Sequence, residues 1–268
     1  MAEKEEKKNQ ENNFLIKIST IRGRSYSSNL YLKKDDVIVA INNQFYTFGE
    51  KKLTEELKEL KKSHEKAILT ILRGDAFFDV IISNSLGCKF VTTTFEETQK
   101  IREQFSSKEN FDIDELDEYL VLRDAYRRYE IIKSSTSIAA GLFPPLWLAY
   151  TQKWWVLGLF LAFISLLIAV NPFIFLLGWL LTSLYCYKGQ LNLLYSFSML
   201  EGKVFCNNIA ANSIDHAQRI IRKLDAKSRF KYTKLENPNI EEITEKDNKK
   251  SDENNEENIV DEKKEALV

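Results

Sequence analysis

One segment of the chain is almost free of charge. Residues 134–187 contain a single charged side chain, Lys153, although charged residues make up 29% of the whole sequence. A soluble domain of about 100 to 150 residues spreads its charges throughout its length. The sequence therefore predicts a chain that is part soluble and part membrane.

Within this segment two apolar runs are long enough to suggest helices. The 17 uncharged residues 154–170 would rise about 26 Å as a helix, against a hydrocarbon thickness of ~30 Å. Asn171 and Pro172 interrupt the pattern before a second run, because proline removes a backbone donor and disfavours helix at the preceding residue. We predict transmembrane helices at 154–170 and 173–188, and an interfacial or re-entrant segment at 138–150. The alternative, a buried hairpin of a soluble core, would expose large apolar patches.

The basic flanks predict an orientation for this hairpin. Residues 188–234 carry nine Lys or Arg and three acids, and such flanks remain on the cytoplasmic side. The polar residues 1–13 do not resemble a secretory signal. We therefore expect a protein integral to the inner membrane, with cytoplasmic soluble parts. The residues expected at the membrane interface are Trp147, Trp154, Trp155, Lys188, Arg219, Arg222 and Lys223. The last three either attract anionic membrane lipids or form a solvated helix face.

The N-terminal part reads as a small domain of strands and one helix. Apolar runs at 14–21 and 36–41 predict two strands, and leucines at i, i+4 and i+7 predict an amphipathic helix at 53–62. The runs 67–72 and 77–82, separated by Arg73, Gly74 and Asp75, predict a hairpin. The expected order is strand, strand, helix and hairpin.

These elements carry a family resemblance. The stretches SYSSNLYLKKDDVIVAINNQFYTFGEKKLTEELKEL (25–60) and AILTILRGDAFFDVII (67–82) resemble a bacterial PDZ domain of the type associated with serine proteases. The resemblance covers about residues 14–83, with Tyr31, Asp35 and Asn43 where that family has glycine. The family's carboxylate-binding loop would precede Leu15, and a polar tail stands there instead.

The PDZ resemblance implies a mode of protein binding. Such domains add an extended peptide as a strand at a sheet edge and select its side chains in pockets. Here the peptide would lie beside residues 15–21, in a groove against the helix at 53–62. The peptide-binding residues implied are Leu15, Ile16, Ile18, Leu53 and Leu57.

A second, weaker resemblance covers residues 137–200. The stretch GLFPPLWLAYTQKWWVLGLF (141–160) is similar to a small two-helix bacterial integral-membrane family of unknown function. This resemblance implies a location and no activity.

The remaining segments complete the expected organisation. Residues 84–134 are predicted to form a helical connector: a strand leading into a helix capped by Thr94 and Glu97, then a long helix from residue 112. Residues 191–234 are predicted to be a basic cytoplasmic unit, with a strand at 203–211, a turn and a helix capped by Ser213. Low apolar content predicts a disordered tail at 1–13 and a disordered acidic tail at 235–268.

The sequence lacks the patterns of common catalytic and cofactor sites. It has two histidines and no HExxH, and its three cysteines form no CxxC pair, which disfavours zinc, disulfide and thioredoxin-like chemistry. The motifs GxSxG, GxxxxGK[ST] and GxGxxG are also missing. The net charge of -1 gives no reason to expect nucleic acid as a partner. We expect no catalytic residue, no metal and no cofactor.

Taken together, these features predict an α+β fold. It would comprise a PDZ-like domain (14–83), the connector, a membrane block (135–190), the strand-turn-helix unit and the tail. The predicted function is that of a non-enzymatic, membrane-anchored adaptor that binds a peptide segment or the C-terminus of another protein. The alternative is a degenerate PDZ-fold subunit that packs against a membrane protease or transporter complex without binding free peptide. A third reading, an intramembrane enzyme, would need activated polar residues inside the apolar runs. The sequence does not indicate an oligomeric state.

Overall fold

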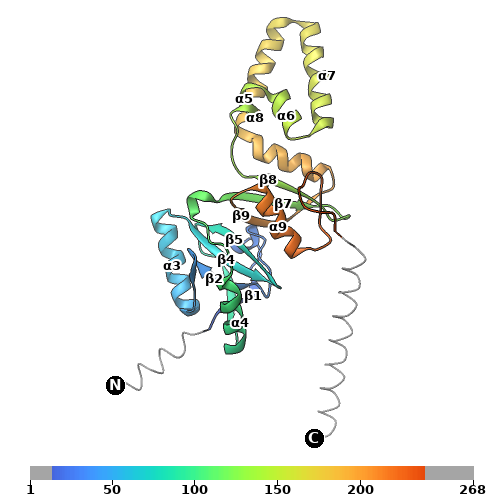
Figure 1. Ribbon diagram of the computed structural model, residues 1–268. Coiled ribbons are helices and arrows are strands. Elements are labelled where there is room, and N and C mark those ends of the chain that lie inside the picture. The colour runs from blue at the N-terminus through green and yellow to red at the C-terminus, as the bar shows by residue number, and fades with distance from the viewer. Residues whose placement is uncertain (1–13, 239–268) are drawn as a thin grey trace, which may run out of the picture.

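The computed structural model describes residues 14–238 as one large mixed sheet with helices around it and a helical hairpin projecting from one end (Figure 1). The predicted tail at 1–13 lies outside the described residues, as does the predicted tail at 235–268 from residue 239 onward. The first two strands, β1 (Ile16–Ile21) and β2 (Val37–Ile41), pair antiparallel, and the short helix α2 (Tyr26–Asn29) lies between them in the sequence. The strand β3 (Gln44–Phe45) pairs with β2. The helix α3 (Gly49–Ser63) and the hairpin of β4 (Ala67–Arg73) and β5 (Ala76–Ile82) follow. The predicted order of these elements is confirmed.

The next segment contains one helix and three strands. The strand β6 (Cys88–Thr92) leads into α4 (Phe95–Ser106). The Thr94 hydroxyl accepts from the Glu97 backbone N–H, and the Glu97 carboxylate accepts from the Thr94 N–H. This capping box confirms the predicted start of the helix. After a single turn of 3-10 helix at Ile113–Glu115, the chain forms β7 (Asp117–Arg123) and β8 (Arg128–Lys133).

The long helix predicted from residue 112 is wrong, and with it the helical connector at 84–134. Residues 117–133 form an antiparallel hairpin, in which β7 also pairs with β9 along its whole length. Asp124 closes the turn because its carboxylate accepts the backbone N–H groups of Tyr126 and Arg128. Apolar residues at mixed three and four spacings also fit two-sided burial in a strand, where Tyr119, Val121 and Leu122 are buried. Pairing with a distant strand decided the outcome.

The C-terminal strand and helix confirm the predicted strand-turn-helix unit. The strand β9 (Val204–Ala211) is followed by α9 (Ile214–Leu224), whose first turn is capped by the Ser213 hydroxyl, and by β10 (Arg229–Phe230). The unit is not separate from the N-terminal part, because the sheet runs in the order β10-β8-β7-β9-β5-β4-β2-β1-β6. Strand β5 meets β9 at Asp79 and Ala210. The main core cluster contains residues from both halves, among them Phe78 and Ile209.

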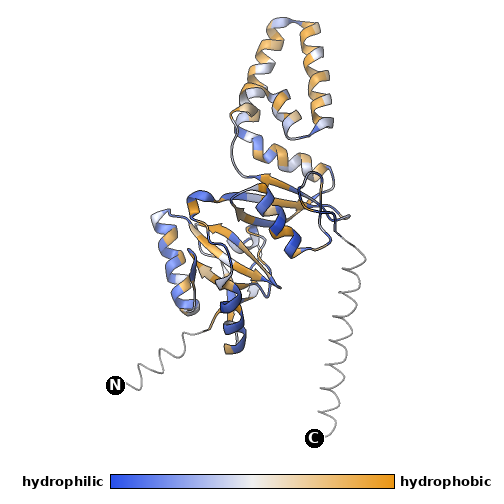
Figure 2. Ribbon diagram, in the orientation of Figure 1, coloured by the Kyte–Doolittle hydropathy of each residue, from blue (hydrophilic) through white to orange (hydrophobic). Residues whose placement is uncertain are grey.

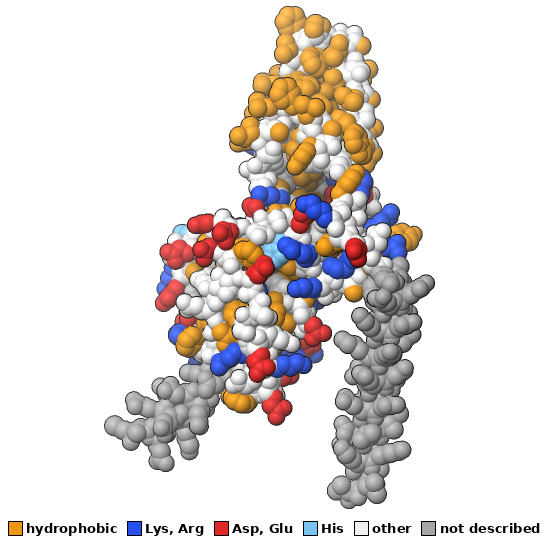
Figure 3. Space-filling model, viewed as in Figure 1, with side chains coloured by type: hydrophobic (Ala, Val, Ile, Leu, Met, Phe, Trp, Pro, Cys, Tyr) orange, Lys and Arg blue, Asp and Glu red, His pale blue; other side chains and the backbone are white. Residues whose placement is uncertain are grey.

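The charge-poor segment forms four helices at one end of the sheet. Two short helices, α5 (Ala139–Leu142) and α6 (Pro144–Tyr150), pack beside α7 (Trp154–Val170) and α8 (Pro172–Leu200). The hairpin of α7 and α8 carries the densest apolar colouring in Figure 2. Apolar side chains cover the visible face of its outer part, while charged side chains begin at its base (Figure 3).

The predicted transmembrane hairpin is wrong, and the expected fold class and integral membrane localisation are corrected with it. Among residues 14–238, no helix combines the length and the apolar character needed to cross a membrane. Helix α7 ends at Val170 after 17 residues, and the apolar run of α8 is interrupted by Lys188 and Gln190. The segment expected to be interfacial, 138–150, packs through Ala140, Trp147 and Leu148 into a small core with α8.

Candidate functional site

The residues predicted to bind a peptide lie in the interior of the protein. Ile16, Ile18, Leu53 and Leu57 belong to the main core cluster, between the sheet and α3. Leu15 lies in a second cluster, on the side of the sheet that α4 covers. None of the five side chains is more than 2% exposed. The structure thus brings four of them together, in the place where the sequence predicted a groove.

A strand of the same chain occupies the edge beside them. Strand β6 pairs antiparallel with β1, with Ile16 opposite Thr92 and Ile18 opposite Phe90. The side chains of Cys88 and Phe90 pack against the main core cluster. Burial raises the pKa of the Cys88 thiol to about 11, and the nearby carboxylate of Glu50 in the first turn of α3 adds to this rise. Strand β6 therefore fills the position in which an external peptide was expected.

The other edge of β6 has no strand partner among the described residues. The Thr93 N–H donates to the Leu15 carbonyl at 2.9 Å. Because the N–H and C=O groups of successive residues in a strand point to opposite sides, those of Phe90 and Thr92 point away from β1. Val91, in the middle of β6, is 49% exposed, and Phe95 at the start of α4 is 56% exposed. This edge, with two apolar side chains beside it, is the candidate functional site and is called the β6 edge below.

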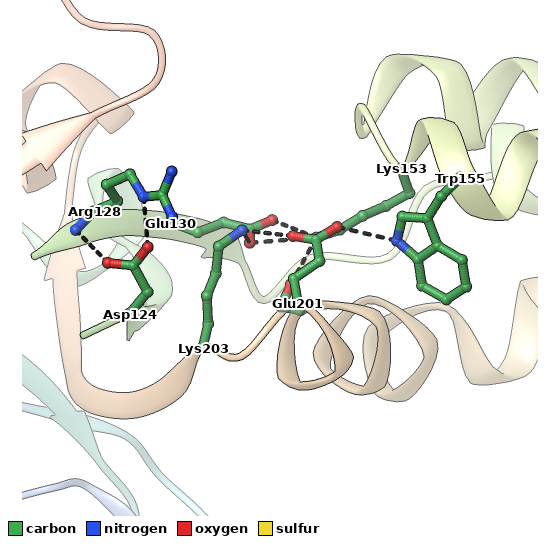
Figure 4. Close-up of polar contacts among 8 residues, drawn as sticks. Asp124, Arg128, Glu130, Lys153, Trp155, Glu201 and Lys203 are labelled. Atoms are coloured by element: carbon green, nitrogen blue, oxygen red, sulfur yellow. Dashed lines mark hydrogen bonds and ion pairs between the residues drawn. The ribbon is translucent and has the colours of Figure 1, made fainter. Parts of the chain in front are cut away.

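A second feature, a charged cluster, fixes the base of the hairpin. The Lys153 ammonium, 2% exposed, lies 3.0 Å from Glu130 on β8 and 3.1 Å from Glu201 after α8, and it donates to the Ser198 hydroxyl at 2.9 Å. Lys203 lies 2.6 Å from each of the same two carboxylates (Figure 4). Two cations and two anions satisfy one another here, so the cluster joins the helices to the sheet without a net charge.

The ion pairs control the protonation of the cluster. Burial raises the pKa of Glu130 and of Glu201, but hydrogen bonds and charges from Lys203 and Lys153 outweigh it, so both pKa values lie below the ordinary 4.5. Burial lowers the pKa of Lys203, and its bonds to the two carboxylates reverse this and raise it. All three groups remain charged at neutral pH. The arrangement is typical of a structural junction and offers no unpaired base or nucleophile.

The residues predicted at a membrane interface do not form one group. Trp147 is buried against the helices around it. Trp154 is exposed at the start of α7, and the Trp155 indole donates to Glu201 at 3.3 Å (Figure 4). Lys188 is exposed midway along α8. The other three, Arg219, Arg222 and Lys223, lie on α9, which packs on the sheet.

Sequence reasoning found β6 as a strand but missed where it pairs. The alternation of Cys88, Phe90 and Thr92 with Lys89 and Val91 is a two-fold pattern, yet nothing in it specifies β1 as the partner. The lone Lys153 in an apolar run was a usable signal for the second feature. A buried lysine needs an acidic partner, and Glu201 is the first acidic residue after the charge-poor segment.

Comparison with known proteins finds no protein-family model and no curated protein that matches the chain. Neither family resemblance drawn from the sequence therefore gains support. Residues 14–238 also contain no group of three or more His, Cys, Asp or Glu side chains able to hold a metal ion.

Proposed function

We propose that this chain is a non-enzymatic binding protein that takes up an extended segment of another protein as an added strand along the β6 edge. The observation that carries the proposal is the outward direction of the Phe90 and Thr92 backbone groups at the end of the sheet. Unpaired N–H and C=O groups on an edge strand are a template for another strand. Addition there requires no rearrangement of β6.

The surroundings of the edge favour a partner with apolar side chains. Val91 and Phe95 are exposed next to the backbone groups, so an added strand would cover them. The edge is also short, at five residues, which favours a short segment over a whole sheet. Strand addition is also the binding mode that the PDZ resemblance implies, although β6 fills the groove expected from it and the proposed site is the outer edge of β6. Tyr31, Asp35 and Asn43, which stand where that family has glycine, all have positive φ.

A proline substitution tests the proposal directly. Thr92→Pro removes one outward N–H and keeps the inward bonds of Val91 and Thr93, and proline is tolerated on an edge strand. We expect the folded full chain to retain a subset of twelve-residue peptides on an array that presents both free and amidated C-termini. Thr92→Pro should weaken this binding at least tenfold, about 1.4 kcal/mol.

The matched control is Thr92→Val, which keeps the N–H and should bind as the natural protein does. Binding of both peptide classes would indicate internal segments, whereas dependence on a free carboxylate would indicate C-termini. An array without bound peptide, or a Thr92→Pro protein with unchanged binding, would exclude strand addition at this edge.

A second candidate function is suggested by the exposed hairpin. Leu159 and Leu161 on α7 are 64% and 49% exposed, and Phe173 on α8 is 79% exposed. Residues two apart on a helix are separated by about 200°, so α7 exposes apolar side chains on opposite sides. Large exposed apolar patches mark interaction surfaces. The chain would then be a structural subunit whose hairpin is enclosed by a partner complex.

A further inference from the structure

A cleft lies where the N-terminal strands meet the C-terminal ones, away from the β6 edge. Its volume is about 860 Å³, within the range of about 300–1,000 Å³ that is typical of small-molecule sites. One wall comes from the segment after α2, with Tyr31 to Lys34, and the opposite wall from β7, β8, β9 and α9. Arg73 joins the walls, because it pairs with Asp36 at 2.7 Å and donates to Asn207 on β9 at 3.3 Å.

The cleft is lined by an excess of cationic side chains. Two of its five cations are neutralised: Arg73 by Asp36 and Arg127 by Asp225, the latter at 2.8 Å. The other three form no ion pair with a carboxylate in the described residues: Lys33, Lys34 and Arg123. Unneutralised cations in a concave site attract anions, because the low-dielectric walls focus the field.

Arg123 lies beside a hydrogen-bonded pair of side chains in the cleft wall. The Tyr129 hydroxyl donates to Asp225 at 2.8 Å. The Arg123 guanidinium lies close to the same hydroxyl, and its interaction with Tyr129 is the main cause of its raised pKa. Since a guanidinium has five donor N–H groups in a fixed fork, most of them remain free for a ligand.

Three cations act on one point of the cleft wall. Burial raises the pKa of the Cys206 thiol to about 11, and the charges of Arg123, Lys33 and Arg73 oppose this rise. These cations come from three separate segments of the chain, yet all lie close enough to influence the same sulfur atom. Because Arg73 is already paired with Asp36, an anionic group bound near Cys206 would meet Arg123 and Lys33.

Apolar side chains complete the lining. Leu32, Val121 and Phe205 lie among the cations, and the Phe205 ring packs against Tyr31 with centroids 5.9 Å apart. A ligand that matches both the cationic and the apolar side chains of the lining has an anionic end and an apolar or aromatic body. Phosphate suits three unpaired cations better than a single carboxylate does, because it carries nearly two charges and more acceptor oxygens.

We infer that this cleft binds a small organic phosphate, with the phosphate held by Arg123 and Lys33, the neighbouring Lys34 adding positive charge on the same wall, and the organic body against Leu32, Val121 and Phe205. The site is independent of strand addition at the β6 edge.

Isothermal titration of the full chain with three probes tests this inference: AMP, inorganic pyrophosphate and adenosine. AMP and pyrophosphate should bind saturably below about 1 mM, a common upper level for small-molecule sites, and adenosine should not. Arg123→Gln should weaken AMP binding at least tenfold, and Lys34→Gln provides a second variant on an exposed side chain. Lys62→Gln, which removes an equal charge from the exposed side of α3, should leave it unchanged.

Three results would overturn the inference. Neither AMP nor pyrophosphate binds, or adenosine binds as well as AMP, or Lys62→Gln weakens AMP binding as much as Arg123→Gln does. Thr92→Pro should not affect AMP binding, so the failure of one proposal is distinguishable from the failure of the other.

Discussion

Replacing the buried Lys153 by methionine should weaken the attachment of the hairpin base to the sheet. The substitution keeps an unbranched side chain and removes the ammonium that bonds Glu130, Ser198 and Glu201. Breaking a buried ion pair by removing one partner costs about 3–5 kcal/mol. Lys203 still pairs with both carboxylates, whose side chains are 22% and 28% exposed. We therefore expect a loss at the lower end, about 3 kcal/mol.

The measurement is the free energy of unfolding in urea. Tryptophan fluorescence monitors the unfolding, because the Trp155 indole donates a hydrogen bond to Glu201 in the same cluster. Lys188→Met is the matched control. It removes an exposed lysine from α8 and should change stability by less than about 0.5 kcal/mol. A Lys153→Met protein as stable as this control would refute the role assigned to the cluster.

The difference in free energy of unfolding between the natural protein and Lys153→Met should also depend on pH. The pKa values of Glu130 and Glu201 are lowered in the folded protein. The two carboxylates therefore contribute their full stabilisation above about pH 4.5, the ordinary pKa of glutamate. This stabilisation is lost as the pH falls through their lower pKa values in the folded protein. The gap between the natural protein and Lys153→Met should be constant from pH 7 to about pH 5 and should shrink below that. A gap that persists undiminished at pH 3 would contradict the ion-pair explanation.

Three further predictions concern single positions. Leu166, 62% exposed on α7, should promote association of the protein through the hairpin. Leu166→Lys should therefore lower the sedimentation coefficient of the protein in sedimentation velocity, whereas Leu166→Met should not. Vesicle co-sedimentation of the same variants would show whether lipid rather than protein covers the surface. Gly141→Ala should lower the stability of the protein by about 1–3 kcal/mol, because the added Cβ would lie 2.9 Å from the Tyr187 side chain. Gly158→Ala should leave the stability unchanged, because there is open space around the position of its added Cβ. Asp35 has φ 73°, so Asp35→Val should destabilise by about 1–2 kcal/mol and Asp35→Gly should leave urea unfolding nearly unchanged.

The local elements of the fold were predictable because short-range chemistry specifies them. The Thr94–Glu97 capping box, the Ser213 cap and the hairpin around Gly74 each depend on contacts within a few residues. The substituted turn positions follow the same logic. Asp35 and Asn43 adopt positive φ, as aspartate and asparagine do more readily than most side chains.

The candidate sites were less predictable, because each depends on segments far apart in the sequence. The four groove residues were identified as neighbours, yet their cover by Phe90 on β6 was not foreseen. The cations of the cleft come from residues 33–34, 73 and 123–127. No local pattern relates these segments to one another.

By itself the sequence determined the order of the N-terminal elements, the capped starts of α4 and α9, which residues are apolar enough for the core, and that residues 134–187 form a distinct charge-poor block. Only the tertiary structure decided that residues 117–133 are strands, because β7 pairs along its whole length with the distant strand β9 and β8 pairs with β7. It also decided that one sheet unites the N-terminal and C-terminal strands, and that the helical hairpin is docked through Lys153. The physical reason is range. Capping and periodicity act between neighbours in sequence, whereas strand pairing and ion pairing at a junction depend on which distant surfaces meet.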